Sequence, residues 1–130
     1  MIDCDLSNFG CSGGYLVSAI LHLIDEGTVT ESCNPYTDKY ARCTFRCDGD
    51  VEYKRYYCKP GSLALPTRAS DIQRHLMTRG PMMVGLSVYE DFLSFKSGVY
   101  HYTAGRMVGG HAMKLIGWGT AENGWKYWIL

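Results

Sequence analysis

Six cysteines among 130 residues are the feature that most constrains how this chain can fold. So high a cysteine density is typical of proteins that fold in an oxidising compartment and carry disulfides. Four of the six lie in one stretch of loop character, from Thr28 to about Ser62: Cys33, Cys43, Cys47 and Cys58. A loop this long in a compact fold needs cross-links, so we expect disulfides there. No Cys-x-x-Cys or His-Glu-x-x-His spacing is present, which argues against zinc, and we predict no metal site and no cofactor.

Charge and hydrophobicity exclude several classes of function. The chain has 13 basic and 13 acidic residues, whereas binding to nucleic acid or attachment to membranes by charge needs a basic excess. No apolar run reaches the roughly 18 residues of a membrane span. A hydrophobic content of 46% excludes a disordered chain. These values indicate a soluble globular protein with no nucleic-acid partner and no membrane span.

The first half of the chain is predicted to contain a helix followed by the cysteine-bearing loop. Apolar residues recur on one helical face over residues 14–26, and Gly27 follows in the position that commonly ends a helix. A second, shorter helix is predicted over 71–79, because Ser70 and the three residues after it resemble a capping box. A Gly-Pro pair would end this second helix.

The second half of the chain is predicted to be rich in β-strands. Apolar and β-branched runs predict one or two helical turns over 90–96 and four strands: 82–88, 98–102, 112–119 and 125–130. An Asn-Gly pair predicts a hairpin between the last two strands. The character of the sequence changes near residue 60. We therefore predict an α+β chain with a helical part over 1–60 and a β-rich part over 61–130.

The C-terminal end of the sequence suggests a piece of a longer protein, whereas the N-terminal end indicates only that no signal peptide begins at Met1. The residues after Met1 include two aspartates and no basic cluster, so they do not read as a signal peptide. The last residues, 128–130, lie in the middle of an apolar run, where strands seldom end. We therefore expect the chain to be incomplete.

His111 is the strongest candidate for chemistry among the four histidines. It follows Gly109 and Gly110, which allow close approach of a ligand, and it opens a predicted strand that would hold the imidazole rigidly. An imidazole commonly serves as a general base or as the partner of a thiolate. From the spacing alone, a purely structural role for His111 stays open. The other histidines are interpreted as surface, boundary or strand-end residues: His22, His75 and His101.

Blocks of sequence in order along the chain resemble the papain family of cysteine peptidases. Residues 1–14 resemble the segment Leu-Val-Asp-Cys … Gly-Cys-x-Gly-Gly of that family. The blocks at 80–81, 89–100 and 109–119 resemble its cathepsin B branch, the last of them the strand of the catalytic histidine. Residues 127–129 resemble the strand that leads to the Asn-Ser-Trp-Gly motif. The resemblance implies a papain-like fold of two lobes, one helical and one a β-barrel, with the active site between them, and only part of that fold lies in this chain.

The resemblance also implies roles for particular residues. His111 corresponds to the catalytic histidine, which would pair with a thiolate and later protonate the leaving amine. Six residues match substrate-binding positions of the family: Gly13, Gly14, Leu16, Gly85, Gly110 and Ala112. The first two glycines would bind an extended substrate by main-chain hydrogen bonds, unless they form no more than a turn into the helix. Of the others, Leu16, Gly85 and Ala112 would line the pocket for the residue before the cleaved one.

The nucleophilic cysteine of the family and the asparagine that orients its histidine have no match in this chain. The nucleophile belongs to a Cys-Gly-Ser-Cys-Trp stretch that would precede Met1, and the asparagine would follow Leu130. Without a thiolate no covalent intermediate can form, so we expect this chain alone to be inactive. The whole protein would be an endopeptidase that cleaves peptides or proteins through an acyl-thioester, with a propeptide or protein inhibitor as a further partner in the cleft. Two alternatives stay open: a non-catalytic relative with a binding or structural role, and a disulfide-linked secreted module of other ancestry.

The cysteines give the resemblance a second set of implications. The resemblance implies disulfides between Cys4 and Cys43 and between Cys33 and Cys47. It also implies that Cys11 bonds to a cysteine near the nucleophile, which would precede Met1, so Cys11 is expected to be unpaired in this chain. Cys58 has no counterpart. Together with the cysteine density, the resemblance implies a lysosomal, vacuolar or secreted protein.

One departure from the cathepsin B branch bears on the type of activity. That branch carries a long, histidine-bearing insertion that blocks one end of its cleft and makes it trim dipeptides. Only residues 34–42 separate Cys33 from Cys43 here, and none of them is a histidine. We therefore predict an open cleft and endopeptidase activity for the whole protein.

Overall fold

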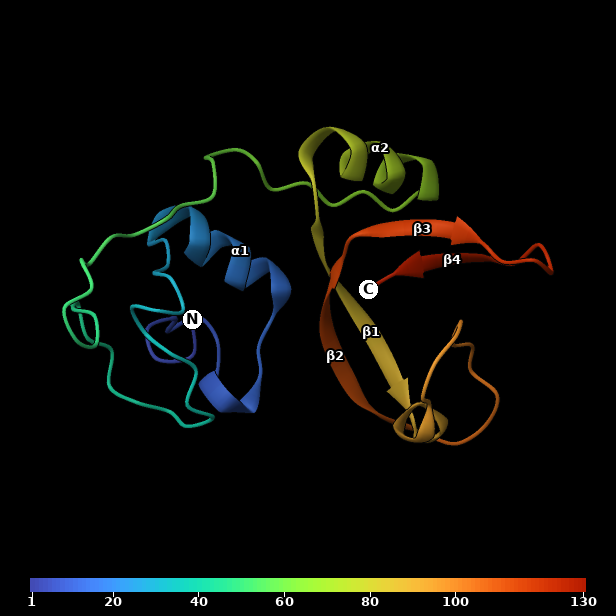
Figure 1. Ribbon diagram of the computed structural model, residues 1–130, viewed down its shortest axis with the longest axis horizontal. Helices are drawn as coiled ribbons and strands as arrows, with labels where there is room; N and C mark the ends of the chain where they lie inside the picture. The colour runs from blue at the N-terminus through green and yellow to red at the C-terminus, as the bar shows by residue number, and fades with distance from the viewer. The chain divides into compact units, whose positions relative to one another are not determined.

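The computed structural model describes residues 1–130 and divides them into two compact units (Figure 1). Unit 1 is Met1–Ala64 and unit 2 is Leu65–Leu130. Unit 1 holds one α-helix and a long loop, whereas unit 2 holds one α-helix and the four β-strands. No helix in the structure combines the length and the apolar sequence that crossing a bilayer requires.

The α-helix of unit 1, α1, spans Leu16–Asp25 and lies within the predicted range. It begins after Tyr15, whose backbone is extended with φ −104° and ψ 131°. A short 3-10 helix, η1 (Gly10–Ser12), precedes it. Gly27 ends α1 as predicted, because its φ of 71° suits glycine and its N–H donates to the carbonyl of His22 at 3.0 Å.

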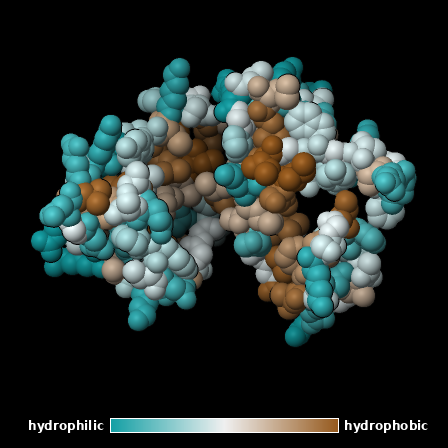
Figure 2. Space-filling view, in the orientation of Figure 1, coloured by the Kyte–Doolittle hydropathy of each residue, from teal (hydrophilic) through white to brown (hydrophobic).

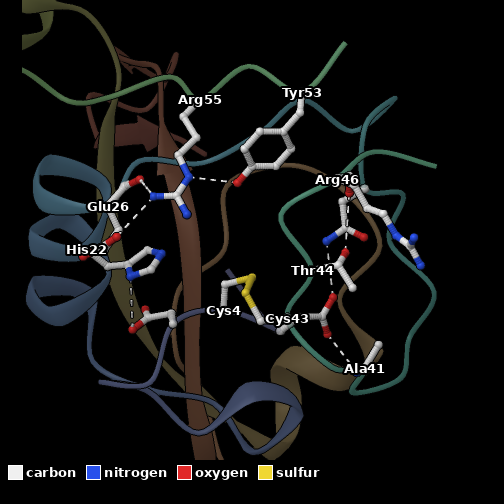
Figure 3. Close-up of a disulfide and its surroundings, with 12 residues drawn as sticks. Cys4, His22, Glu26, Ala41, Cys43, Thr44, Arg46, Tyr53 and Arg55 are labelled. Carbon is white, nitrogen blue, oxygen red and sulfur yellow. Dashed lines mark hydrogen bonds and ion pairs between the residues drawn. A yellow bond between two sulfur atoms is a disulfide. The ribbon is translucent and has the colours of Figure 1, made fainter. Parts of the chain in front are cut away.

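Two disulfides cross-link the long loop of unit 1. They join Cys4 to Cys43, 39 residues apart, and Cys33 to Cys47, 14 residues apart; the first of them is drawn in Figure 3. These are the two pairings that the resemblance implies. The two remaining cysteines are unpaired, one exposed and one half-buried: Cys11 and Cys58. Because a disulfide restricts the unfolded chain, these links stabilise a loop that has little regular structure.

The α-helix of unit 2, α2, spans Ala69–Arg79, and the predicted capping box at Ser70 is wrong. The backbone already turns at Arg68, whose carbonyl accepts the N–H of Asp71 at 3.0 Å, so Ser70 lies inside the helix. No side chain caps the first turn. Asp71 stands there instead, where a carboxylate interacts favourably with the helix dipole, and it forms an ion pair with Arg74.

The four strands of unit 2 form two separate antiparallel sheets: β1 (Met82–Tyr89) with β2 (Met107–Leu115), and β3 (Gly117–Thr120) with β4 (Lys126–Ile129). The prediction of one strand over 112–119 is wrong, because the chain changes partner at Ile116. The N–H of Ile116 donates to the carbonyl of Ile129 in β4 at 2.9 Å, whereas Leu115 still pairs with Met82 of β1. The predicted hairpin between the last two strands is confirmed.

No strand forms over 98–102, although the sequence predicts one. The carboxylate of Asp91, in the 3-10 helix η2 (Glu90–Ser94), holds this segment in another shape. Its Oδ1 accepts the hydroxyl of Tyr100 at 2.7 Å, and its Oδ2 accepts the N–H of Thr103 at 2.8 Å. These hydrogen bonds override the β propensity of the segment. Because no strand forms there, the interpretation of His101 as a strand-end residue is also wrong.

Asp91 should make the stability of the protein sensitive to acid. Desolvation would raise its pKa, but hydrogen bonds from Thr103, Tyr100 and Ala104 outweigh that effect and lower the pKa to about 2. Since the folded-state pKa lies below the ordinary value of 3.8, the carboxylate stabilises the fold above pH 3.8, and this contribution is lost as the pH falls through about 2. We expect Asp91→Asn to lower the midpoint of thermal unfolding at pH 7, and the difference from the unaltered protein to shrink toward pH 2.

Circular dichroism of both proteins across this pH range measures the effect of Asp91→Asn. The matched control is Asp50→Asn, because Asp50 is an exposed aspartate with no side-chain hydrogen bond or ion pair in the chain. An equal shift for both variants, or a shift for Asp91→Asn that does not change with pH, would contradict the role given to Asp91.

Few apolar side chains in this chain are buried. The buried hydrophobic residues are Cys33 and Leu115, at 2% and 3% exposure, and Figure 2 shows hydrophobic residues on the surface of both units. The two disulfides therefore stabilise a chain in which few apolar side chains are buried.

Candidate active site

His111 lies in β2, directly opposite Leu86 of β1. Because side chains alternate along a strand, His111 shares a face of the sheet with Met113, which is half-buried, and with Leu115, which is buried. The side chain of His111 is exposed. An exposed imidazole on a paired strand can accept a proton from a group that approaches it and can return that proton.

The fold does not require glycine at the two positions before His111. Neither Gly109 nor Gly110 has a positive φ, and a Cβ added to either would meet no atom within 4 Å. A residue with a Cβ would therefore fit this chain at both positions. The missing side chains leave room beside His111 that another molecule can occupy.

The remaining predicted residues of unit 2 lie on the other face of the same sheet. Gly85 and Ala112 are direct partners across β1 and β2, and Gly110 pairs with Ser87. Strand alternation places these residues on the face opposite to His111. Because these side chains are small or absent, the main chain in the middle of this face has little bulk over it, whereas Met83 and Lys114 lie farther along the same face.

The predicted residues of unit 1 lie together at the start of α1. Gly13 has a φ of 95°; its N–H donates to Gly10 at 3.2 Å, and its carbonyl accepts the N–H of Phe9 at 2.9 Å. Gly14 is exposed, and its own main-chain N–H and C=O form no hydrogen bond within the chain. Leu16 is the half-buried first residue of α1. The free N–H and C=O of Gly14 are the groups with which an extended peptide pairs.

A buried polar network beside these glycines is not predicted from the sequence. Asp5 is 5% exposed, and its carboxylate accepts the N–H of Ser7 at 3.0 Å and the side-chain amide of Asn8 at 2.6 Å. Nδ1 of His22, which is labelled in Figure 3, lies 3.8 Å from the same carboxylate. The signal that could reveal this network is the Asp-x-Ser spacing, which is typical of a turn in which the aspartate accepts an N–H two residues on.

A cavity of about 460 Å³ lies beside the Cys4–Cys43 disulfide, and no predicted catalytic or substrate-binding residue lines it. Figure 3 shows Arg55 there between Tyr53 and Glu26. Its guanidinium donates to the Tyr53 hydroxyl at 2.9 Å and to the Glu26 carboxylate at 3.2 Å. The hydrogen bond to Tyr53 raises the pKa of Arg55 above its ordinary value, against partial desolvation. With its charge paired in this way, Arg55 is a structural residue and not a free site for an anion.

The predicted site residues thus form one group in each unit. Unit 1 holds Gly13, Gly14 and Leu16, and unit 2 holds Gly85, Gly110, His111 and Ala112. No three His, Cys, Asp or Glu side chains in the structure are placed to hold a metal ion. The structure presents an exposed imidazole at His111 and main-chain groups without hydrogen bonds at Gly14.

Comparison with known proteins gives a consistent match along the whole chain. Residues 1–130 match the family described as "Papain family cysteine protease". The chain is 37% identical to "Cathepsin B-like protease 1" of Arabidopsis thaliana, over 96% of this chain and 37% of that protein. It is 34% identical to "Cathepsin B-like CP3" of Giardia intestinalis, over 100% of this chain and 45% of that protein.

A solved structure shows the same likeness in three dimensions. The chain matches "proCathepsin B S9 from Trypanosoma congolense" with a TM-score of 0.85 at 30% identity, over 98% of this chain and 45% of that one. The fold is therefore papain-like, and the chain spans less than half the length of these relatives. The match over every residue and the similarity to cathepsin B-like proteins show that this chain belongs to the papain family of cysteine proteases.

Proposed function

We propose that the full-length protein that carries this chain is a cysteine peptidase with His111 as its catalytic histidine. The observation that carries the proposal is the exposed imidazole on the paired strand β2, next to two glycines that the fold does not require. His111 would take the proton of a cysteine thiol, and the thiolate would attack the peptide carbonyl. The imidazolium would then protonate the leaving amine, which leaves an acyl-thioester for water to hydrolyse.

The nucleophile is expected to come from another part of the protein. Four of the cysteines in this chain are held in disulfides, and the two others, Cys11 and Cys58, do not lie in the sequence pattern of the nucleophile. The asparagine that orients His111 and most donors to the oxyanion would likewise lie elsewhere. We therefore expect the 130-residue chain by itself to be inactive.

Substrate binding is proposed for the residues of both groups. Gly14 would pair with the main chain of an extended peptide, since its N–H and C=O are exposed and unpaired. Leu16 in unit 1, and Gly85 and Ala112 in unit 2, are the candidates for contact with the side chains of the substrate. In this proposal units 1 and 2 are parts of the helical and β-barrel lobes predicted over 1–60 and 61–130.

The proposed partners are peptides or proteins as substrates, with a propeptide or a protein inhibitor as a further ligand. The solved structure that the chain resembles is described as a procathepsin, which supports a propeptide. Two disulfides support a lysosomal, vacuolar or secreted location, because such compartments allow disulfides to persist.

We expect the full-length protein to act as an endopeptidase. The segment between Cys33 and Cys43 is short, and the cysteine at each of its ends forms a disulfide with a residue outside the segment. The segment contains no histidine of the kind that the cathepsin B branch uses to retain the end of a peptide. Mass spectrometry of the products from a peptide of about 15 residues measures the cleavage positions. Internal cleavage is expected as the main reaction, and dominant release of C-terminal dipeptides would contradict the open cleft.

A second candidate function is binding without catalysis. It would apply if the residue at the nucleophile position, which this proposal places in another part of the protein, is not a cysteine. Hydrolysis of a fluorogenic peptide by the full-length protein separates the two functions, because a non-catalytic relative would bind the peptide without cleaving it. Cleavage that a thiol-alkylating reagent abolishes would establish the peptidase.

A further inference from the structure

The turn before α1 is built around a buried carboxylate. Asp5 is 5% exposed, although a buried charge is costly unless it is paired and hydrogen-bonded. It accepts the backbone N–H of Ser7 and the side-chain amide of Asn8, and the imidazole of His22 lies 3.8 Å away. Asp5 therefore has three polar neighbours within the unit, and Asn8 is the one that connects it to the glycines.

Asn8 links this carboxylate to the segment that holds Gly14. Its Nδ2 donates to Asp5 at 2.6 Å, and its Oδ1 accepts the main-chain N–H of Tyr15 at 2.6 Å. The side chain also lies so close to Gly14 that a Cβ added there would overlap it, 2.5 Å from Cγ and 2.7 Å from Cβ of Asn8. One amide thus fixes the residue after Gly14 and occupies the space beside Gly14 itself.

The rest of the turn depends on backbone hydrogen bonds that do not include Gly14. Phe9 donates to the carbonyl of Gly13, and Gly13 donates to the carbonyl of Gly10. Gly14 has no such hydrogen bond, so its orientation is set by Gly13 on one side and by the bond from Tyr15 to Asn8 on the other. The side chain of Asn8 is therefore the one that lies against Gly14 and holds the residue that follows it.

We propose that Asn8, held by Asp5, is a positioning residue that aims the main-chain groups of Gly14 at an extended peptide. This inference rests on the proposed function, in which Gly14 binds the substrate backbone. Asn8 does not touch the substrate and acts through Gly14 alone. Its loss therefore weakens substrate binding and leaves the chemistry at the catalytic histidine unchanged.

The test measures KM and kcat for a fluorogenic peptide with the full-length protein and its variants. Asn8→Ala removes both hydrogen bonds of the side chain. We expect KM to rise about tenfold, the loss that corresponds to one hydrogen bond between Gly14 and the substrate backbone, and kcat to stay within about twofold. A rise in KM at constant kcat is the signature of lost ground-state binding, which a general loss of folded protein would not produce.

The matched control is Asn34→Ala. Asn34 lies in the same unit and also donates its side-chain amide to an aspartate, Asp3, at 3.3 Å, but no hydrogen bond joins it to the segment of Gly14. Its kinetic constants should equal those of the unaltered protein. If both variants raise KM to the same extent, the effect belongs to unit 1 as a whole and the inference is wrong.

A double variant that exchanges the two residues, Asp5→Asn with Asn8→Asp, tests the role of the hydrogen bond between their side chains. We call it the swapped pair, and it also guards against a single variant that fails to fold. Asn8→Asp keeps an acceptor for Tyr15 but loses the donor to Asp5 and places two carboxylates together, so we expect a raised KM. Adding Asp5→Asn restores an amide-to-carboxylate hydrogen bond in the opposite direction, and KM should return most of the way to its original value. A swapped pair no better than Asn8→Asp alone would overturn the inference.

The outcomes separate this inference from the proposed function. An unaltered protein that cleaves no peptide refutes the proposed function and the inference together. An active unaltered protein whose Asn8→Ala variant has the same KM refutes the inference alone. A raised KM that the swapped pair restores supports both.

Discussion

Replacing His111 by alanine in the full-length protein should lower kcat for peptide hydrolysis by about 10⁴- to 10⁶-fold, the range seen when the base of a catalytic triad is removed. The physical reason is that the thiol loses its proton acceptor and the leaving amine loses its proton donor in the same substitution. The fold should be little affected, because the side chain of His111 is exposed. Steady-state kinetics with a fluorogenic peptide, together with the thermal unfolding midpoint, measure both effects.

The matched control for this experiment is His75→Ala. His75 is a half-buried histidine of α2 in the same unit, and it forms no side-chain hydrogen bond or ion pair in the chain. Its variant should keep kcat within about twofold, since most substitutions away from functional groups change little. An active His111→Ala protein, or an equal loss in both variants, would show that His111 is not the catalytic histidine.

Removing the Cys4–Cys43 disulfide should destabilise the protein by about 4 kcal/mol, and removing Cys33–Cys47 by about 3 kcal/mol. The order follows from the sequence separations of 39 and 14, because closing the longer loop removes more conformational entropy from the unfolded chain. Each variant replaces both cysteines of one pair by serine. Urea unfolding followed by circular dichroism gives the two free energies.

The control for the disulfide variants is Cys58→Ser, which changes an unpaired cysteine of the same unit. It should alter the free energy of unfolding by no more than about 1 kcal/mol. Equal stability of all three variants would mean that the disulfides do not hold the loop. A larger loss from the shorter loop would mean that local packing around buried Cys33 matters more than chain entropy.

The elements with strong local signals are those that the sequence predicts correctly. The apolar spacing and Gly27 locate α1, and the Asn-Gly pair locates the turn between β3 and β4. The errors arise where a distant partner decides the local structure. The carboxylate of Asp91 captures the segment over 98–102, and Ile116 leaves one sheet for another because its hydrogen-bond partner lies in β4. Neither partner can be identified from a window of neighbouring residues.

The candidate site divides in the same way. The glycines before His111 are visible in the sequence, and the structure adds that the fold does not need them. The role of Asn8 is not visible, because it depends on hydrogen bonds to Asp5 and Tyr15 that form only when the turn folds back on itself. A pattern of residue types shows which groups can react. It does not show which groups hold them in place.

The measurement that tests the central claim most directly is the pH dependence of thiol alkylation in the full-length protein. A small reagent such as iodoacetamide reacts with the thiolate, so its rate reports the ionisation of the nucleophile without any need for substrate. If His111 is the partner of that thiolate, the unaltered protein should react rapidly below pH 6, and His111→Ala should shift the rise in rate toward the ordinary cysteine pKa of about 8.5. Identical pH profiles for the two proteins would contradict the claim that His111 serves a catalytic cysteine.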